Sequence, residues 1–271
     1  MATSRTRNTT TTKVHASDDV ARQIDRQIEE NLCTPRGLKL DKTDFVLVVH
    51  NFEAHDGVVH KELRIPVRVR IGVGVDIASR GAITVREGRA LVRVNPDKAE
   101  KEIVEIGGIR YIPRTSDFFN TYKSTLVHEL THACDILTGI GRFRPQDMKP
   151  LYPDPDEYKV RYRTSDVEVR AYTRQLLWLL AQKLEDRVQQ IHSMSRPASS
   201  SIDNINAYLT AEPEKLLQHL REKKIVPLKL RNWLDTIQQH APEAYQKVLS
   251  SLGNLQASLR ARYQHTLYSG A

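Results

Sequence analysis

The amino-acid sequence predicts an α+β protein in which a group of strands precedes a group of helices. Apolar residues alternate with polar ones from Ile65 to Val75, which is the period of a half-buried strand. Shorter apolar runs continue to about residue 112. Beyond residue 117 the apolar residues recur at helical spacing, and helices are expected at 118–138, 166–192 and across most of 202–266. We therefore expect an antiparallel-rich mixed sheet followed by helices.

Changes in composition divide the chain into three parts. Residues 1–17 are polar, rich in threonine and free of acidic residues, so a disordered tail is expected, with a transit peptide as the alternative. Residues 18–192 form the predicted main domain, which opens with a helix. The stretch 193–201 is rich in Ser and Pro and resembles a linker. It would separate a helical accessory region, residues 202–271, from the main domain.

Turn residues place two hairpins in the strand region. Residues 82–85 and 91–94 flank a charged turn that contains Gly88, and residues 103–104 and 109–112 flank Gly107-Gly108. Later in the chain, residues 143–164 contain several prolines and many charges, which favours an irregular connection.

Composition limits the classes of function. The 271 residues include 39% hydrophobic residues, no apolar run long enough to span a membrane, and two cysteines, which cannot form a disulfide framework. We therefore expect no membrane partner, and a cytoplasmic or other intracellular location. The net charge of +8 raises the question of nucleic acid. Nucleic acid stays open as the less favoured partner, because the basic residues are dispersed and lack an aromatic-interleaved patch.

The helix expected at 118–138 carries one polar stripe on a mostly apolar surface. A helix that is apolar on most sides is buried, and buried polar groups need partners. The stripe therefore indicates a site. Its members recur at helical spacing: Thr121, Thr125, His128, His132 and Asp135.

His128, Glu129 and His132 form the pattern H-E-x-x-H within this helix. Histidines four residues apart point the same way, so both imidazoles can bind one zinc ion. Glu129 lies about 100° around the helix from His128, off the metal but within reach of a metal-activated water. It is the candidate general base. A structural pair of hydrogen-bonded histidines is the alternative.

The motif and its setting resemble the zincin metallopeptidases, in which a mixed sheet is followed by the H-E-x-x-H helix and a second helix. The resemblance covers about residues 105–190 and implies a zinc-dependent hydrolase that cleaves a protein or peptide substrate. It also implies that the strand before the active-site helix, here Ile109 to Ile112, pairs with extended substrate. The metzincin branch is excluded, because Asp135 and Thr138 occupy the positions of its glycine and third ligand.

The remaining pattern is similar to the gluzincins, whose second helix supplies a glutamate in E-x-x-A. Glu168 and Ala171 match it, so the resemblance implies Glu168 as the third metal ligand. Two alternatives stay open. Ser165-x-x-Glu168 is also a capping box, in which Glu168 only supports the helix start. Asp166 is the other candidate ligand, as in an aspartate-type site.

Supporting roles are less constrained. Asp135 is a candidate to orient an imidazole, and Tyr172, Tyr158 or Tyr162 is a candidate to stabilise an oxyanion. Two other functions compete with a general peptidase. One is a non-catalytic, zincin-like structural or assembly protein, and the other is a basic regulatory protease that acts on a repressor or a nucleic-acid-associated protein. An intact Glu129 argues against the first, because a structural zinc needs no base.

Overall fold

The computed structural model describes residues 16–54, 56–72, 81–140, 154–193 and 199–268. Their order confirms an α+β protein with strands before most of the helices. The first half contains α1 (Ala16–Leu32), β1 (Cys33–Thr34), β2 (Gly37–Leu40), β3 (Lys42–Glu53), β4 (Val59–Ile71), β5 (Gly81–Arg86), β6 (Arg89–Val94), a 3-10 turn η1 (Asp97–Glu102), β7 (Val104–Ile106) and β8 (Ile109–Pro113). The second half contains α2 (Asp117–Asp135), a π turn η2 (Ile136–Ile140), α4 (Pro155–Thr164), α5 (Asp166–His192), α6 (Ser199–Thr210), α7 (Pro213–Glu222), α8 (Leu228–His240) and α9 (Pro242–Tyr268).

The described strands form two sheets, whereas the sequence predicted one. One sheet has the order β3-β4-β6-β5 and the other β1-β2-β8-β7. Both predicted hairpins are present, as β5–β6 and β7–β8, and β4–β6 is a parallel pair among antiparallel ones. The second sheet arises because β8 pairs with β2, which carries the β7–β8 hairpin away from the longer strands.

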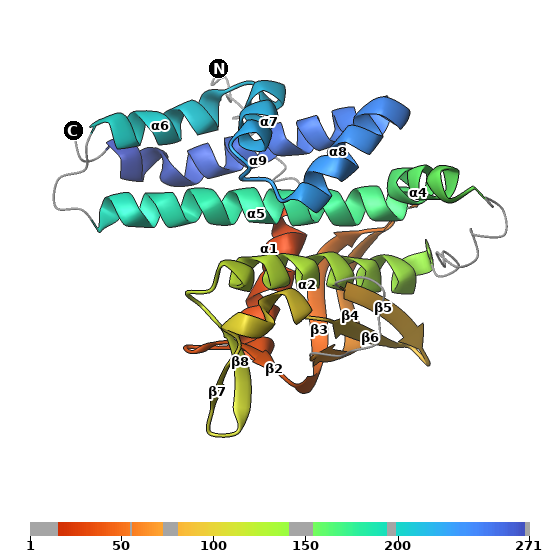
Figure 1. Ribbon diagram of the computed structural model, residues 1–271. Coiled ribbons are helices and arrows are strands. Elements are labelled where there is room, and N and C mark those ends of the chain that lie inside the picture. The colour runs from red at the N-terminus through yellow and green to blue at the C-terminus, as the bar shows by residue number, and fades with distance from the viewer. Residues whose placement is uncertain (1–15, 55, 73–80, 141–153, 194–198, 269–271) are drawn as a thin grey trace, which may run out of the picture.

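The β3-β4-β6-β5 sheet buries one face. Alternate side chains on three of its strands are inaccessible, as in Leu47 and Val49 on the edge strand β3, Val67 on β4 and Val92 on β6. Helices α1 and α2 pack against this sheet. Figure 1 shows α2 passing across the strands, and the polar stripe of α2 therefore lies inside the protein.

Helix α1 also covers the outer edge of β3. The Gln27 side chain accepts a hydrogen bond from the Val48 amide at 2.9 Å and donates one to the Val48 carbonyl. Gln23 makes the same two bonds with His50. An unpaired strand edge can pair with a strand of another chain. Because Gln23 and Gln27 bond to backbone groups of β3, they block such pairing at this edge of the sheet. The opposite edge strand, β5, pairs on its inner side with β6.

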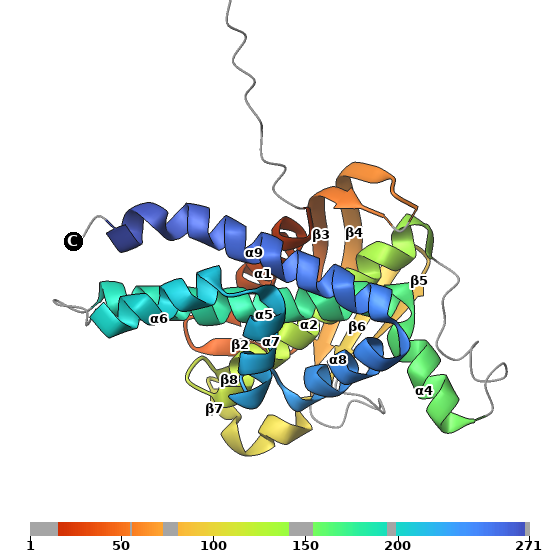
Figure 2. The same cartoon turned by 90° about the horizontal axis from the view of Figure 1, so that it is seen from above.

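Helix α5 lies between the α2 layer and the C-terminal helices. In Figure 1 the helices α6 to α9 lie above α5, with α2, α1 and the strands below, and Figure 2 shows α9 running along α5. The C-terminal region thus packs on α5, and Trp233 of α8 donates a hydrogen bond to the Arg163 carbonyl of α4 at 3.2 Å. The domain boundary near residues 193–201 stays a prediction.

The structure bears on two predicted irregular segments, residues 143–164 and 1–17. The irregular connection predicted for 143–164 is wrong over its last part, where α4 forms. The Asp154 side chain caps α4 by accepting from the Asp156 amide at 2.8 Å, and Pro155 occupies its first turn. That Asp-Pro pair was the sequence signal for this helix. The predicted disordered tail, residues 1–17, lies almost entirely outside the described residues.

Candidate metal centre

Helix α2 presents the H-E-x-x-H motif from a rigid and buried position. The helix begins at a Ser116 cap, whose hydroxyl accepts a hydrogen bond from the Phe118 amide at 3.0 Å. His128, Glu129 and His132 are 4%, 6% and 6% exposed. Side chains this buried are costly to leave unpaired, so the residues around them determine what the site can do.

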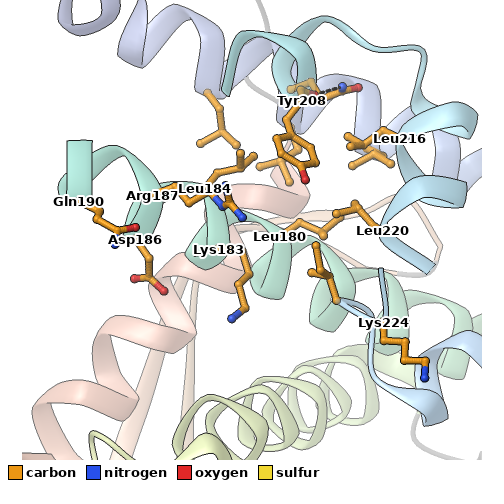
Figure 3. A pocket seen from close by; sticks show the side chains of 15 residues that line it. Leu180, Lys183, Leu184, Asp186, Arg187, Gln190, Tyr208, Leu216, Leu220 and Lys224 are labelled. Atoms are coloured by element: carbon orange, nitrogen blue, oxygen red, sulfur yellow. Dashed lines mark hydrogen bonds between the residues drawn. The ribbon is translucent and has the colours of Figure 1, made fainter. Parts of the chain in front are cut away.

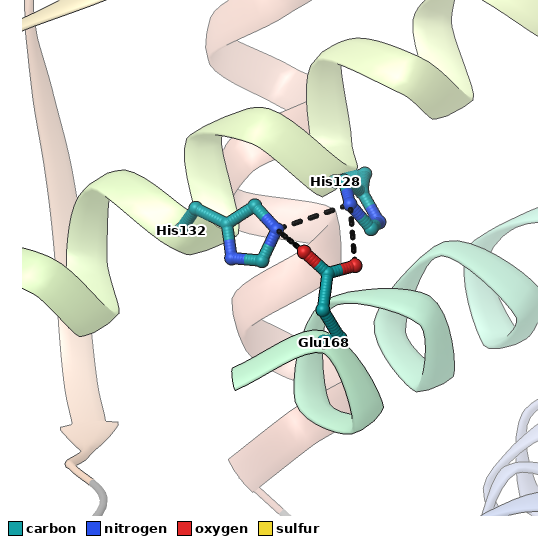
Figure 4. A group of neighbouring side chains, drawn as sticks. All are labelled: His128, His132 and Glu168. Carbon is teal, nitrogen blue, oxygen red and sulfur yellow. Dashed lines mark hydrogen bonds and ion pairs between the residues drawn. The ribbon is translucent and has the colours of Figure 1, made fainter. Parts of the chain in front are cut away.

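The structure brings Glu168 of α5 to the two histidines. Figure 4 shows both imidazoles extending from α2 toward the carboxylate. The Nε2 atoms of His128 and His132 are 3.1 Å apart. Oε1 of Glu168 is 3.2 Å from Nε2 of His132, and Oε2 is 3.6 Å from Nε2 of His128. Two imidazole nitrogens and the two oxygens of one carboxylate therefore face one another.

These separations fit a small tetrahedral metal ion. Ligand atoms bound at 2.0–2.1 Å in a tetrahedron lie about 3.3 Å from one another. The distances between the two Nε2 atoms, 3.1 Å, and from Nε2 of His132 to Oε1 of Glu168, 3.2 Å, are close to that value, and Oε2 of the same carboxylate lies 3.6 Å from Nε2 of His128. Within the described part of the chain this is the group of His, Cys, Asp and Glu side chains that could hold a metal. Two histidines with one carboxylate also match the ligand types of catalytic zinc sites.

The protonation states suit metal binding. Burial, with the neighbouring His132, holds the pKa of His128 well below 6.5, which keeps that imidazole neutral. For Glu168, burial raises the pKa, but the two histidines and a hydrogen bond from Tyr162 outweigh it and lower the pKa to about 2. The carboxylate is therefore ionised at neutral pH and ready to bind a cation.

Glu129 lies beside this cluster and does not belong to it. Burial raises the pKa of its carboxyl group to about 7, against a usual value of 4.5. A group with that pKa exchanges protons readily near neutral pH, as a general base must. Gly81, the first residue of β5, leaves room for it, because a Cβ there would lie 2.6 Å from Oε1 of Glu129.

The structure does not form the capping box that competed for Glu168. Ser165 stands at the N-cap of α5 but makes no side-chain capping bond, and its hydroxyl donates instead to the Tyr162 carbonyl at 2.7 Å. Glu168 is 2% exposed and faces α2. Asp166, the alternative ligand, is exposed and lies outside the converging group. Ala171 is fully buried in α5.

Asp135 has a different partner from the one expected. It is fully buried and forms an ion pair with Arg170 of α5, with Oδ1 3.1 Å from Nη2. Nδ1 of His132 has no hydrogen-bond partner within the described residues, so Asp135 does not orient that imidazole through a direct bond. Its ion pair links the end of α2 to α5, the two helices that carry His128, His132 and Glu168.

Aromatic side chains enclose the histidines. The Tyr172 ring packs on His128, with centroids 4.4 Å apart, and stacks on Trp233 at 5.2 Å. The Tyr172 ring thus packs against His128, the usual role of a buried tyrosine. Tyr162 of α4 forms the hydrogen bond to Glu168, and burial raises the pKa of both tyrosines above their ordinary value of 10.

Two residues near the site were missed in the sequence. Trp233 and Lys229 belong to α8, far along the chain, and Nζ of Lys229 lies 5.2 Å from the Tyr172 ring centroid. No local pattern connects an isolated Lys-x-x-x-Trp with a motif on another helix, so only the fold could reveal them. Gly81 was also missed, because its role depends on a contact with Glu129.

The strand predicted to pair with substrate is not available for it. β8, which includes Ile109 to Ile112, is paired with β2 on one side and with β7 on the other. The expectation was wrong because β8 belongs to the second sheet. Strand β5 packs against α2 instead, and its first residue contacts Glu129.

A separate cavity of about 470 Å³ lies among α5, α6, α7 and α9. Figure 3 shows leucines such as Leu180 and Leu220, with Tyr208, around it. Exposed charged side chains, including Lys183 and Arg187, stand at its border. It contains none of the metal-cluster side chains, and no titratable group in it is both buried and unpartnered among the described residues.

Comparisons of the chain with protein-family models, with curated proteins and with solved structures give no match. No helix in the described ranges has the length and apolar character needed to cross a membrane. The functional conclusion therefore depends on the geometry of the His128, His132 and Glu168 cluster.

Proposed function

We propose that the protein is a zinc-dependent metallopeptidase of the zincin type, with His128, His132 and Glu168 as metal ligands. The observation that carries the proposal is the convergence of two buried imidazole nitrogens on one buried carboxylate, with N–N and N–O distances of 3.1 to 3.6 Å, beside a fourth buried residue that is not a proposed ligand. That residue, Glu129, has a pKa of about 7. A site that only stabilised the fold would have no use for such a base.

In the proposed hydrolysis, one set of residues binds the metal and Glu129 transfers the proton. When bound, zinc supplies a Lewis acid that polarises the substrate carbonyl and lowers the pKa of water. Glu129 accepts the proton of the water as its oxygen attacks the carbonyl carbon, and then delivers that proton to the leaving amine nitrogen. Glu168 and the two imidazoles hold the metal, and the Tyr162 hydrogen bond keeps the Glu168 carboxylate in place.

Strand β5 is the candidate binding edge for an extended substrate. It is an edge strand, the opposite edge of its sheet is closed by glutamines of α1, and its first residue lies against Glu129. A peptide added antiparallel or parallel to β5 would form main-chain hydrogen bonds next to the base. This arrangement favours proteins or peptides in extended conformation as substrates.

The proposal is tested with zinc-loaded, full-length protein and an unfolded substrate such as casein. We expect cleavage that a chelator abolishes and that added zinc restores. A protein that contains one zinc per chain but cleaves no peptide bond would favour the non-catalytic, structural alternative. Cleavage that persists after the metal is removed would contradict the metal-dependent mechanism.

A further inference from the structure

The outer face of the β3-β4-β6-β5 sheet collects basic side chains that are spread along the sequence. Side chains of a strand point alternately to its two faces, and the buried set of this sheet packs with α1 and α2. The other set, within residues 42–50, 62–70, 82–86 and 89–93, therefore points away from both helices. We call this set the basic sheet face. Seven of its side chains are basic: Lys42, Arg64, Arg68, Arg70, Arg86, Arg89 and Arg93.

Two carboxylates offset only part of this charge. Asp44 accepts hydrogen bonds from Arg68 at 2.7 and 3.0 Å, and its Oδ1 lies 4.0 Å from Nη1 of Arg89. Glu62 pairs with Arg64 at 2.5 Å. With seven basic and two acidic side chains, and histidine counted as neutral, the basic sheet face has a net charge of +5, against +8 for the whole chain. One face of one sheet thus accounts for more than half of the net charge.

Three cations lie side by side across neighbouring strands of the basic sheet face. Lys42 of β3 is opposite Arg70 of β4, and Arg70 is opposite Arg93 of β6. Neighbouring strands are about 4.8 Å apart, so the three positions span about 10 Å. Among the described residues, no carboxylate forms an ion pair with any of the three. Like charges directly opposite one another destabilise a sheet, so this row is unfavourable unless an anion lies over it.

The width of the basic sheet face favours the phosphates of a DNA duplex over the edges of its bases. Four strands at about 4.8 Å spacing make a surface about 14 Å wide, which exceeds the roughly 12 Å of the major groove. A surface that cannot enter the groove contacts the backbone, where Arg and Lys neutralise phosphates whatever the sequence.

The other side chains of the basic sheet face argue against single strands and RNA. No Phe, Tyr or Trp occupies these described positions, so the bases of a single strand would have no ring on which to stack. Thr84 is the single hydroxyl or amide side chain among them. Duplex RNA is recognised largely through contacts to its 2′-hydroxyl groups, for which this surface offers few partners.

We propose that the basic sheet face binds the phosphate backbone of double-stranded DNA without regard to sequence. The inference is independent of the proposed hydrolase function. DNA would lie on the side of the sheet opposite α2, which carries His128 and His132, and would leave the metal cluster uncovered. A peptidase held in this way would be close to proteins bound to the same DNA.

The test titrates full-length protein into a fluorescently labelled DNA duplex and follows the anisotropy of the label. With a duplex of about 24 base pairs we expect binding at about 50 mM salt, and log K should fall against log salt with a slope of about −4, as four or five neutralised phosphates give. Two duplexes of unrelated sequence should bind equally well, because no base is read.

The double variant Lys42→Gln/Arg70→Gln removes two charges from the row of three. At about 0.1 M salt its affinity should fall by about 50-fold, and its salt slope should become shallower by about 2, because two phosphate contacts are lost. Each single change should give about half of that loss in log K. The melting temperature should stay at or above that of the parent protein, because the change removes a like-charge pair.

Lys223→Gln/Lys247→Gln is the matched control, because it removes the same charge from exposed lysines of the C-terminal region. Its affinity for the duplex should stay within about twofold of the parent value, since it loses no phosphate contact. An equal loss in this control would assign binding to net charge alone and overturn the inference. Parent-like affinity in Lys42→Gln/Arg70→Gln would do the same.

Other anionic partners are compared in the same titration. A parent protein that does not bind the duplex at low salt would overturn the inference. Tighter binding of the separated single strand or of an RNA duplex of the same sequence would also overturn it, because the partner would then not be double-stranded DNA. Vesicles of phosphatidylcholine and phosphatidylserine test for a membrane surface. Competition by these vesicles at lower phosphate concentration than unlabelled duplex would replace DNA by a membrane.

Discussion

The Glu168 carboxylate lies 3.2 Å from Nε2 of His132, although the two residues belong to different helices. The contact orders both side chains in a buried place. Without a metal the carboxylate favours the protonated imidazole, since it raises the pKa of His132 against the lowering effect of burial. With a metal, both groups would become ligands and His132 would be neutral. Protons and metal therefore compete for the same cluster.

That competition predicts a pH dependence of metal affinity. The pKa of His132 in the metal-free protein is raised above 6.5, so a proton must leave as the metal binds. Affinity for zinc should fall as pH drops through that pKa, measured by competition with a chelator whose own protonation is corrected for. In the metal-free protein the raised pKa of His132 stabilises the fold at low pH, and this contribution is lost as pH rises through it. Affinity that does not change between pH 8 and pH 5 would contradict the competition.

Glu129→Gln should remove the base and leave the site otherwise intact. Gln has nearly the same shape, so zinc content and thermal stability should match the parent protein. The rate of hydrolysis should fall by about 10²–10⁴, the usual contribution of general-base catalysis. Steady-state kinetics on a cleaved peptide provides the measurement. Turnover equal to that of the parent would exclude Glu129 as the base.

Gly81→Ala tests whether β5 must approach Glu129 closely. The added Cβ would lie 2.6 Å from Oε1 of Glu129 and 2.8 Å from Cγ2 of Thr125, so the base or the strand must shift. We expect zinc to be retained and kcat/KM to fall by up to about 100-fold, the effect of a displacement of about 1 Å. Gly253→Ala is the control, because its Cβ would meet only Pro213 at 3.3 Å. Unchanged kinetics would show that β5 can move away freely.

The buried Lys123 of α2 should stabilise the fold through its ion pairs with α1. It is 3% exposed and forms ion pairs with Asp25 at 2.8 Å and Glu29 at 2.5 Å, both on α1. Lys123→Met should cost about 3 kcal/mol of unfolding free energy, because the Asp25 carboxylate loses its ion-pair partner while Glu29 keeps only Arg114. Urea denaturation measures the loss, and Lys61→Met on the exposed face of β4 is the control. A loss no larger than that of Lys61→Met would contradict the assignment.

The same ion pairs should make the unfolding free energy depend on pH in the acid range. Burial raises the pKa of Glu29, but hydrogen bonds from Arg114 and Lys123 outweigh it and lower the pKa below 4.5. A depressed carboxyl pKa contributes stability above the unfolded-state value, and the contribution is lost as pH falls through the folded-state value. Unfolding free energy should therefore decline below about pH 4.5. The decline should be smaller in Lys123→Met, and an equal decline in both proteins would exclude Lys123 as its origin.

Local patterns in the sequence were enough to predict most of the secondary structure, and His128, Glu129 and His132 as candidate site residues. The spacing of His128 and His132 fixes their common direction on a helix, and periodicity predicted α5 with its bounds. Glu168 came from a short resemblance, with a helix cap and Asp166 as rivals, because no spacing along one helix encodes a contact between two. Strand pairing was the weakest inference. Whether β8 pairs with β2 or borders the active site depends on contacts between distant segments.

The central claim is that Glu168 completes a metal site with His128 and His132. Zinc content and affinity, measured for Glu168→Gln and for Asp166→Asn on folded, full-length protein, test it most directly. We expect one zinc per chain in the parent protein and in Asp166→Asn. In Glu168→Gln, affinity should be weakened by more than the about 10- to 100-fold that loss of a supporting residue costs. Tight zinc binding by Glu168→Gln, with loss of zinc from Asp166→Asn, would contradict it and assign the third ligand to Asp166.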